Sequence, residues 1–283
     1  MLRRKREGSV ICASCGVLVG VNDDRCYNCG RRHPGLWGFG PALRALGQDL
    51  GFVPFVMGTC VLIYALTLLA SGSRMSMQPG FGFLSPDRFV LVAFGASGAA
   101  PVFGAGRWWS VLSAGWLHAG ALHIFFNMWV LRQMGPATAE LYGPARTVII
   151  YICGSIAGFT LSTLMAYYLP GVPLIGGGSL TVGASASIAG LIGAIFHYGR
   201  RGGSSQARMY ASQYIIAMVF YAFVFQGIDN AAHAGGFAGG YLVSRALDPL
   251  RPERVDHMVV ALTLLVLSLG AVVVSVVTGL DYL

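Results

Sequence analysis

GASASIAGLIGA, residues 183–194, is a stretch of small residues that carries a serine and has the pattern of a tightly packed helix. Ser185, Ala189 and Gly193 recur four residues apart, so one face of such a helix is small throughout. A second small face lies beside the first. In a membrane, small faces let the backbone of a neighbouring helix come close. The pattern therefore predicts a close-packed helix with Ser185 on it.

A later stretch, DNAAHAGGFAGGY at residues 229–241, has the same character and carries a histidine. Ala232, Gly236 and Gly240 recur four apart around His233. Two such helices in contact would bring the Ser185 hydroxyl and the His233 imidazole into hydrogen-bond reach, the minimum for an activated serine nucleophile. On these residues alone, ordinary helix packing with a serine bonded to its own backbone is the simpler interpretation.

The composition is that of a polytopic, all-α membrane protein. The 283 residues are 55% hydrophobic and 11% charged, with a mean hydropathy of +0.65, whereas a soluble domain is about a quarter charged. The net charge of +8 comes mostly from arginines at the ends of apolar stretches, so it does not indicate nucleic-acid binding. The basic N-terminus leads into a polar segment, so we expect no cleavable signal.

Residues 1–35 have the pattern of a small zinc ribbon. Two CxxCG motifs supply four cysteines, enough for one tetrahedral zinc ion. A disulfide pairing fits poorly with a basic N-terminus that stays in a reducing cytoplasm. A module this short buries little core, so we expect the metal to hold it folded. The predicted ligands are Cys12, Cys15, Cys26 and Cys29.

Seven apolar stretches are candidate membrane spans, and the first is close to the roughly 20 residues needed to cross a bilayer. They are residues 52–70, 117–131, 147–169, 182–198, 210–226, 230–247 and 258–280. Residues 36–51 are predicted to be an interfacial linker. Residues 71–117 form a long non-spanning segment, which Trp108, Trp109 and Trp116 are expected to embed at the membrane interface.

Charge asymmetry predicts the orientation of these spans. The N-terminus and the segments 132–146, 199–209 and 245–257 hold most of the arginines, so they are expected on the cytoplasmic side, with the C-terminus outside. Ser185 and His233 then start helices at the outer face. The second span adds His118, His123 and Asn127 at a similar depth, and polar residues in a bilayer tend to face a cavity or bundle interior.

Four motifs follow one another along these spans: GRWWSVLSAGWLHAGALHIFFNMWVL, GPATAELYG, GASASIAGLIGA and AAHAGGFAGG. On them, over about residues 52–247, the chain resembles the rhomboid family of intramembrane serine proteases. The resemblance implies a six-helix core with Ser185 as nucleophile and His233 as base. It also implies an oxyanion site made by His123, Asn127 and the backbone N–H of Ser185.

The resemblance implies supporting roles for further residues. His118 matches an upstream histidine that is structural or lines a water path, Glu140 matches a helix-bracing acid, and Gly183 opens the serine motif. The family has glycine at Ala186, often an aromatic residue at Ala189, and arginine at Ser110. The last departure affects how the segment 71–117 is anchored.

The expected architecture is six helices plus one. It comprises a zinc-ribbon-like module (1–35), a linker (36–51), a rhomboid-like core (52–247) and a seventh transmembrane helix (248–283). Asp229 is expected to cap the helix that carries His233, which leaves a Ser–His dyad without an orienting acid.

The predicted function is an intramembrane serine endopeptidase of a bacterial cell membrane. It would need no cofactor for catalysis, and its zinc would be structural. Its partners would be transmembrane protein substrates, the lipid bilayer and a cytoplasmic protein that docks on the zinc module. Two other classes stay open: a catalytically silent rhomboid-like protein that binds membrane helices, and a metal-handling transporter that uses His118, His123 and His233.

Overall fold

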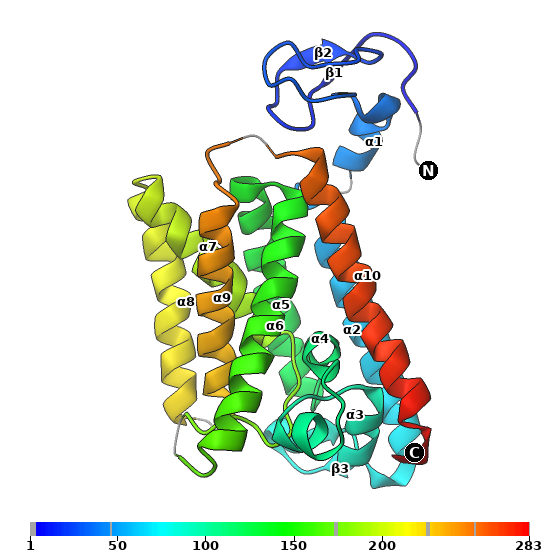
Figure 1. Ribbon diagram of the computed structural model, residues 1–283, viewed down its shortest axis with the longest axis vertical. Helices are drawn as coiled ribbons and strands as arrows, with labels where there is room; N and C mark the ends of the chain where they lie inside the picture. The colour runs from blue at the N-terminus through cyan, green and yellow to red at the C-terminus, as the bar shows by residue number, and fades with distance from the viewer. Residues whose placement is uncertain (1–3, 46, 173–174, 225–226, 252, 283) are drawn as a thin grey trace.

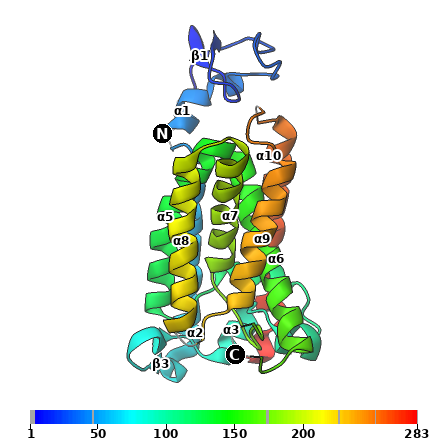
Figure 2. The ribbon, with the colours of Figure 1, turned by 90° about the vertical axis from the view of Figure 1, so that its left-hand side faces the viewer.

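Long helices dominate the computed structural model of the chain (Figure 1). It describes residues 4–45, 47–172, 175–224, 227–251 and 253–282. The long helices are α2 (Phe52–Ser71), α5 (Ala121–Tyr142), α6 (Pro144–Tyr168), α7 (Ser185–Arg201), α8 (Ser205–Val224), α9 (Asn230–Ala246) and α10 (Val255–Thr278). They form a bundle with a small N-terminal module at one end, and the C-terminus lies at the other end (Figures 1 and 2). This confirms the predicted all-α fold of six helices plus one.

Three helices in the described ranges are long and apolar enough to cross a membrane: Phe52–Arg74, which joins α2 to η2 (Gly72–Arg74), then α6 and α10. The helix with the serine, α7, is only 17 residues long and ends on Arg200 and Arg201. It packs against α5, α6, α8 and α9. A helix surrounded by protein needs small residues more than apolar ones, so its low hydropathy follows from its place in the bundle.

The first and sixth predicted spans agree with α2 and α9 to within one residue at each end. The predicted end of the fifth span, Gln226, lies outside the described residues. The second span was placed wrongly: α5 begins at Ala121 and continues to Tyr142. A charged residue such as Arg132 does not stop a helix, whereas Gly143, with φ of +87°, does.

His118 consequently precedes α5 and is not part of it. The short helix η5 (Ala114–Trp116) comes just before, and Gly120 has an extended backbone with φ of 169° and ψ of 167°. Extended backbone at this position delays the start of the helix.

Residues 72–120, which we call loop 1, fold into short elements at the bundle end opposite the N-terminal module (Figure 1). The apolar residues 89–94 lie in the short helix α3 (Arg88–Phe94), with Asp87 as N-cap and Gly95 as C-cap. Trp108 is exposed, as an interfacial anchor should be. Trp116 is buried against Phe55, so its predicted interfacial role is wrong. The elements are β3 (Ser76–Met77), η3 (Gly80–Gly82), β4 (Phe83–Ser85), α3 (Arg88–Phe94), η4 (Ala100–Gly104), α4 (Ser110–Ser113) and η5.

The N-terminal module contains a two-stranded antiparallel sheet of β1 (Ser9–Ile11) and β2 (Leu18–Gly20). The linker after it carries η1 (Leu36–Gly38) and α1 (Gly40–Arg44). Near the end of the linker, the Asp49 carboxylate accepts a hydrogen bond from the Val53 N–H (2.6 Å) in the first turn of α2. At the far end of the chain, η6 (Leu280–Tyr282) follows α10.

Candidate functional site

Ser185 and His233 lie at corresponding places on two neighbouring helices. Ser185 is the first residue of α7, and His233 lies in the first turn of α9. His123 is likewise in the first turn of α5. All three helices begin at the loop 1 end of the bundle (Figures 1 and 2). The three residues therefore lie in the first turns of helices that begin at the same end of the bundle.

The residues beside the serine and the histidine share one buried cluster. Ala186 and Ala232 pack there with Ala114 of loop 1 and Phe159 of α6. A methyl group on Gly158 of α6 would lie 2.7 Å from the Ala186 Cβ and 2.5 Å from the Ala232 carbonyl oxygen. Because Gly158 has no side chain, it leaves room for the methyl group that Ala186 adds to the expected glycine.

Glycines hold α7 and α9 at backbone contact. A methyl group on Gly236 would overlap the Ala186 carbonyl, and one on Gly240 would overlap the Gly190 backbone. The two small faces predicted from the sequence therefore do face each other. Close backbone packing of this kind fixes the separation of the two helices.

His123 and Asn127 lie next to the segment that precedes Ser185. A methyl group on Gly183 would be 2.6 Å from the His123 Nε2 and 3.7 Å from the Asn127 Nδ2. The Ala119 N–H donates to the His123 Nδ1 (3.3 Å), so in the neutral ring Nε2 carries the proton. The Asn127 Nδ2 donates to the His123 carbonyl oxygen (3.0 Å). Two N–H donors therefore stand close to the Gly183 backbone.

Asp229 caps α9, as predicted. Its Oδ1 accepts from the Ala232 N–H (2.9 Å), and its Oδ2 accepts a hydrogen bond from the Ser162 hydroxyl. The Ser162 hydroxyl in turn accepts from the Gly178 N–H (3.0 Å). Both carboxylate oxygens therefore tie the start of α9 to α6 and to the segment before α7. A cavity of about 220 Å³ opens beside them, lined by Gly171, Val172, Gly176, Gly177, Ile228, Asp229 and Asn230.

Two of the three supporting residues of the sequence hypothesis, His118 and Glu140, differ in their surroundings. His118 is fully buried, and its ring centroid lies 5.2 Å from that of His123. Within the described part of the chain, neither ring nitrogen of His118 has a hydrogen-bond partner. Glu140 is exposed, so its bracing role stays a prediction.

An acid that does brace a helix is Glu253, which the sequence analysis did not single out. Its Oε1 accepts from the Arg146 N–H in the first turn of α6 (2.9 Å). Burial raises the pKa of the Glu253 carboxyl, and the Arg146 N–H and guanidinium oppose that rise. The only sequence signal was an acid among basic residues after a predicted span, which is common at membrane surfaces.

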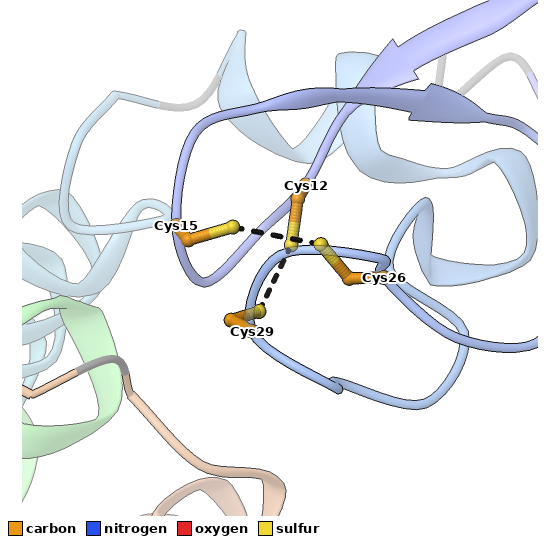
Figure 3. Close-up of side chains that lie close together, drawn as sticks. All are labelled: Cys12, Cys15, Cys26 and Cys29. Carbon is orange, nitrogen blue, oxygen red and sulfur yellow. Dashed lines mark hydrogen bonds between the residues drawn. The ribbon is translucent and has the colours of Figure 1, made fainter.

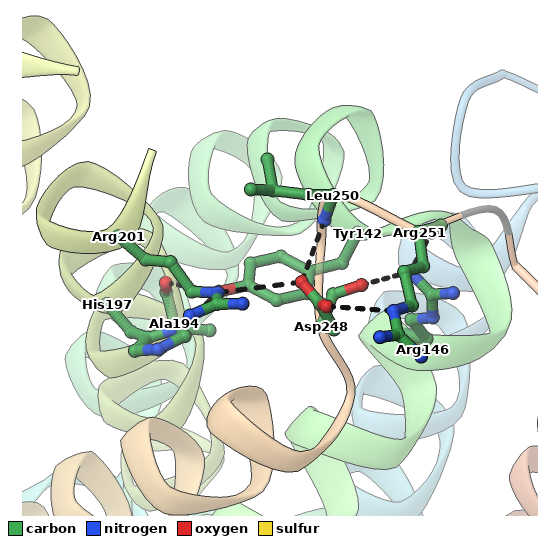
Figure 4. Close-up of polar contacts among 8 residues, drawn as sticks. All are labelled: Tyr142, Arg146, Ala194, His197, Arg201, Asp248, Leu250 and Arg251. Atoms are coloured by element: carbon green, nitrogen blue, oxygen red, sulfur yellow. Dashed lines mark hydrogen bonds and ion pairs between the residues drawn. The ribbon is translucent and has the colours of Figure 1, made fainter. Parts of the chain in front are cut away.

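Arg146 is the centre of a polar network at the end of the bundle that faces the N-terminal module (Figure 4). Its Nη1 donates to the carbonyl oxygens of Asp248 (3.2 Å) and Arg251 (2.9 Å). The Asp248 carboxylate pairs with Arg201 (3.6 Å) and Arg251 (3.2 Å). The ends of α6, α7 and α9 are therefore tied together far from Ser185.

The four cysteines of the N-terminal module converge as their spacing predicted (Figure 3). Their sulfur atoms lie within 4.8 Å of one another and form no disulfide. Gly16 and Gly30 have φ of +76° and +72°, which glycine adopts readily in the tight turns after each CxxC pair. Burial opposes ionisation of Cys15, but hydrogen bonds from the Val17 N–H and Asn28 lower its pKa to about 6. Four thiolates in this arrangement fit a tetrahedral zinc ion.

The module is also attached to the helix bundle. The Ser14 hydroxyl, inside the first CxxC pair, donates to the Glu253 carbonyl oxygen (2.7 Å). Arg31 Nη1 donates to the Ser14 hydroxyl (2.6 Å). The residue that braces α6 therefore also contacts the metal-binding module.

Comparison with known proteins identifies the region around this site. The family model described as Rhomboid domain matches residues 105–250. The rhomboid protease GluP of Bacillus subtilis is 30% identical over 58% of this chain and 30% of its own length. RHOMBOID-like protein 4 of Arabidopsis thaliana is 30% identical over 58% of this chain and 40% of its own length. Inactive RHOMBOID-like protein 8 of the same plant is 28% identical over 46% of this chain and 35% of its own length. The matches thus span less than half the length of each of these relatives.

Proposed function

The chain belongs to the rhomboid family of membrane proteins, and from that premise we propose that it is an intramembrane serine endopeptidase that cleaves transmembrane helices. Ser185 is the nucleophile and His233 the general base. One observation carries the proposal: the residues next to both side chains, Ala186 and Ala232, share one buried cluster. That packing sets the first turns of α7 and α9 against each other.

In the proposed reaction, His233 takes the hydroxyl proton of Ser185 as the serine oxygen attacks the scissile carbonyl carbon. His233 then returns the proton to the leaving amine, and an acyl-enzyme remains. A water molecule next gives a proton to His233 as its oxygen attacks the ester carbon, and His233 returns that proton to the Ser185 oxygen as the acid product leaves. Both carboxylate oxygens of Asp229 accept hydrogen bonds at the start of α9. We therefore assign the reaction to a Ser–His dyad without an orienting acid.

The negative charge of the tetrahedral intermediate needs fixed hydrogen-bond donors. The His123 Nε2, the Asn127 Nδ2 and the backbone N–H of Ser185 are the proposed donors. The closeness of both side chains to Gly183 supports this assignment. A substrate helix must unwind locally to present its scissile carbonyl, because a regular helix keeps that group in its own hydrogen bonds.

The competing candidate is a silent relative that binds membrane helices without cutting them. One specific observation favours it: an inactive RHOMBOID-like protein is among the relatives of this chain. The surroundings of Ala186 favour the protease, because Gly158 has no side chain that would clash with the Ala186 methyl group.

We further propose that the N-terminal module binds structural zinc through its four cysteines and lies on the cytoplasmic side. The arginines at that end of the bundle, including Arg146, Arg201 and Arg251, support this orientation. The C-terminus and Ser185 would then lie towards the outside.

The deciding experiment incubates the full chain in detergent with a transmembrane model substrate and, separately, with a fluorophosphonate probe. Wild type should cut the substrate and be labelled, whereas Ser185→Ala and His233→Ala should do neither while remaining folded. Ser187→Ala, two residues along the same helix, is the matched control and should retain labelling at Ser185. A wild type that binds the substrate helix but neither cuts it nor reacts with the probe would be the silent relative.

A further inference from the structure

The seventh helix, α10, lies outside the part of the chain that matches the family model, yet it packs against α3, α4 and η5 of loop 1. Ser275 of α10 is fully buried. Its hydroxyl accepts a hydrogen bond from the Trp109 Nε1 (3.1 Å), and its carbonyl oxygen accepts from the Arg107 Nη2 (2.6 Å). The same Arg107 nitrogen donates to the Ala93 carbonyl oxygen of α3 (3.3 Å). Ser275 therefore joins three positions of loop 1.

Two glycines, one in loop 1 and one just after α10, allow close packing between loop 1 and α10. Gly95 has φ of +107°, and a methyl group on it would lie 2.7 Å from the Ser275 hydroxyl. One turn beyond Ser275, a methyl group on Gly279 would lie 2.7 Å from the Ala93 Cα. Glycine on each side thus permits contacts that any other residue would block. Packing this close is more than the lipid anchoring of an added helix requires.

Loop 1 is in turn bonded to the segment that leads into Ser185. Ser97 and Thr181 exchange two backbone hydrogen bonds, of 3.0 and 2.7 Å. The Ser110 hydroxyl donates to the Ser97 hydroxyl (3.3 Å), and the Gly183 N–H donates to the Ala114 carbonyl oxygen (3.0 Å). Ser110 and Ala114 belong to the short helices that directly follow Trp109. Loop 1 is therefore bonded both to α10 and to the backbone at Gly183.

We propose that Ser275 is a positioning residue for the proteolytic site: by fixing Arg107 and Trp109 it sets loop 1, and through loop 1 the backbone at Gly183 and Ser185. This rests on the proposed protease function. The family pattern has an arginine at the position of Ser110. In this chain, Arg107 and Trp109 anchor loop 1 instead, through their hydrogen bonds to Ser275 of α10. The expected effect is on catalysis, because a misplacement of about 1 Å at a reacting centre costs about 100-fold in rate.

The test compares Ser275→Ala, which removes the acceptor for Trp109, with Trp109→Phe, which removes the donor. Val273→Ala on the lipid-facing side of α10 is the matched control, since its side chain is 62% exposed. For each full-length protein in detergent we would measure kcat and KM on a transmembrane model substrate, the rate of fluorophosphonate labelling and the melting temperature. Labelling reports on Ser185 without requiring the substrate helix to bind.

Each single variant should lower kcat and the labelling rate by up to about 100-fold, with KM little changed. The double variant should be no worse than the poorer single variant, because both remove the same hydrogen bond. Amide exchange at Thr181 and Gly183 should be faster in Ser275→Ala than in wild type. Val273→Ala should match wild type in all of these measurements.

Labelling of Ser275→Ala and Trp109→Phe at the wild-type rate would overturn the proposal, and so would losses that follow only the folded fraction. If Ser275→Ala fails to fold, Trp109→Phe, which leaves α10 intact, decides in the same way. A wild type that is neither labelled nor active would instead defeat the underlying protease function. The two failures are therefore distinguishable.

Discussion

Gly183 packs directly against His123: a methyl group added to the glycine would lie 2.6 Å from the His123 Nε2. Gly183 also has φ of +130°, a conformation that L side chains rarely adopt. Both constraints act at the backbone that leads into Ser185. The glycine therefore allows a proposed oxyanion donor and the nucleophile segment to occupy adjacent space.

Gly183→Ala should lower kcat by about 100-fold, the loss typical of one misplaced oxyanion donor. The new methyl group must push the His123 ring away or shift the backbone. The measurement is steady-state cleavage of a transmembrane substrate, with melting temperature as a check on folding. Gly171→Ala is a control for an alanine at positive φ, because Gly171 has φ of +78° and nothing within 4 Å of the added methyl group. Equal kcat for both variants would contradict the assigned role of Gly183.

Gly236→Ala should separate α9 from α7, because the new methyl group would overlap the Ala186 carbonyl. Overpacking of this kind destabilises by about 1–3 kcal/mol. It should also abolish fluorophosphonate labelling in the fraction that remains folded. Gly270→Ala in α10 meets nothing within 4 Å, so it should be neutral or stabilise by up to about 1 kcal/mol. Unfolding in detergent measures both, and equal stability of the two variants would argue against backbone contact between α7 and α9.

Asp229→Asn tests whether this acid only caps α9. Asparagine caps a helix about as well as aspartate, so stability should fall by less than about 1 kcal/mol and cleavage should persist. Asp229→Ala removes the acceptors for Ala232 and Ser162 and should cost about 1–2 kcal/mol. The deciding measurement is kcat of Asp229→Asn relative to wild type across a range of pH. A loss of kcat by several orders of magnitude at every pH, with stability intact, would make Asp229 an orienting acid for His233.

Glu253 should make the stability of the protein depend on pH. Burial raises its pKa above the usual value of 4.5 in the folded state. A group with a raised folded-state pKa contributes stability that is fully present below the unfolded-state pKa and is lost as pH rises through the folded-state pKa. The stability of wild type relative to Glu253→Gln should therefore increase as the pH is lowered from about 7 to about 4. Melting temperatures across that range measure it, and an unchanged difference would mean that the carboxyl is not buried as described.

The helices and the cysteine cluster could be predicted because their signals are local. Apolar runs give the positions of α2 and α9 to within one residue, and small residues spaced four apart give the faces at Gly190 and Gly236 that touch. Cysteine spacing alone predicts the four converging sulfurs, since two CxxC turns can close one tetrahedron. In each case the residues that determine the feature are near one another in sequence or repeat with the period of a helix.

The missed features depend on partners far away in sequence. In the sequence Trp116 resembles an interfacial tryptophan, but in the fold Phe55 packs against it. The charge of Arg132 suggested the end of a span, whereas α5 continues to Tyr142. Ser275 lies 166 residues from Trp109. Nothing in the local sequence around a serine in an apolar helix predicts such a distant partner. Long-range hydrogen bonds of this kind determine loop 1, so its anchoring could not be read from local patterns.

The N-terminal module provides the last prediction, because its metal site is separate from the proposed chemistry. Cys12→Ser with Cys15→Ser removes two of four thiolates, so about one zinc ion per chain should be lost and the module should unfold. Ser14 lies between these cysteines and bonds to Glu253, so this contact should also be lost. Cleavage of a minimal transmembrane substrate should survive, because the module lies at one end of the bundle and α7, whose first residue is Ser185, begins at the other (Figures 1 and 2). Metal analysis, amide exchange of residues 4–35 and a cleavage assay give the three readouts. Cys153→Ser, a free cysteine in α6, is the control and should keep both metal and activity. If the double variant kept a folded bundle yet lost cleavage as completely as Ser185→Ala, the metal site and the proposed active site would be coupled.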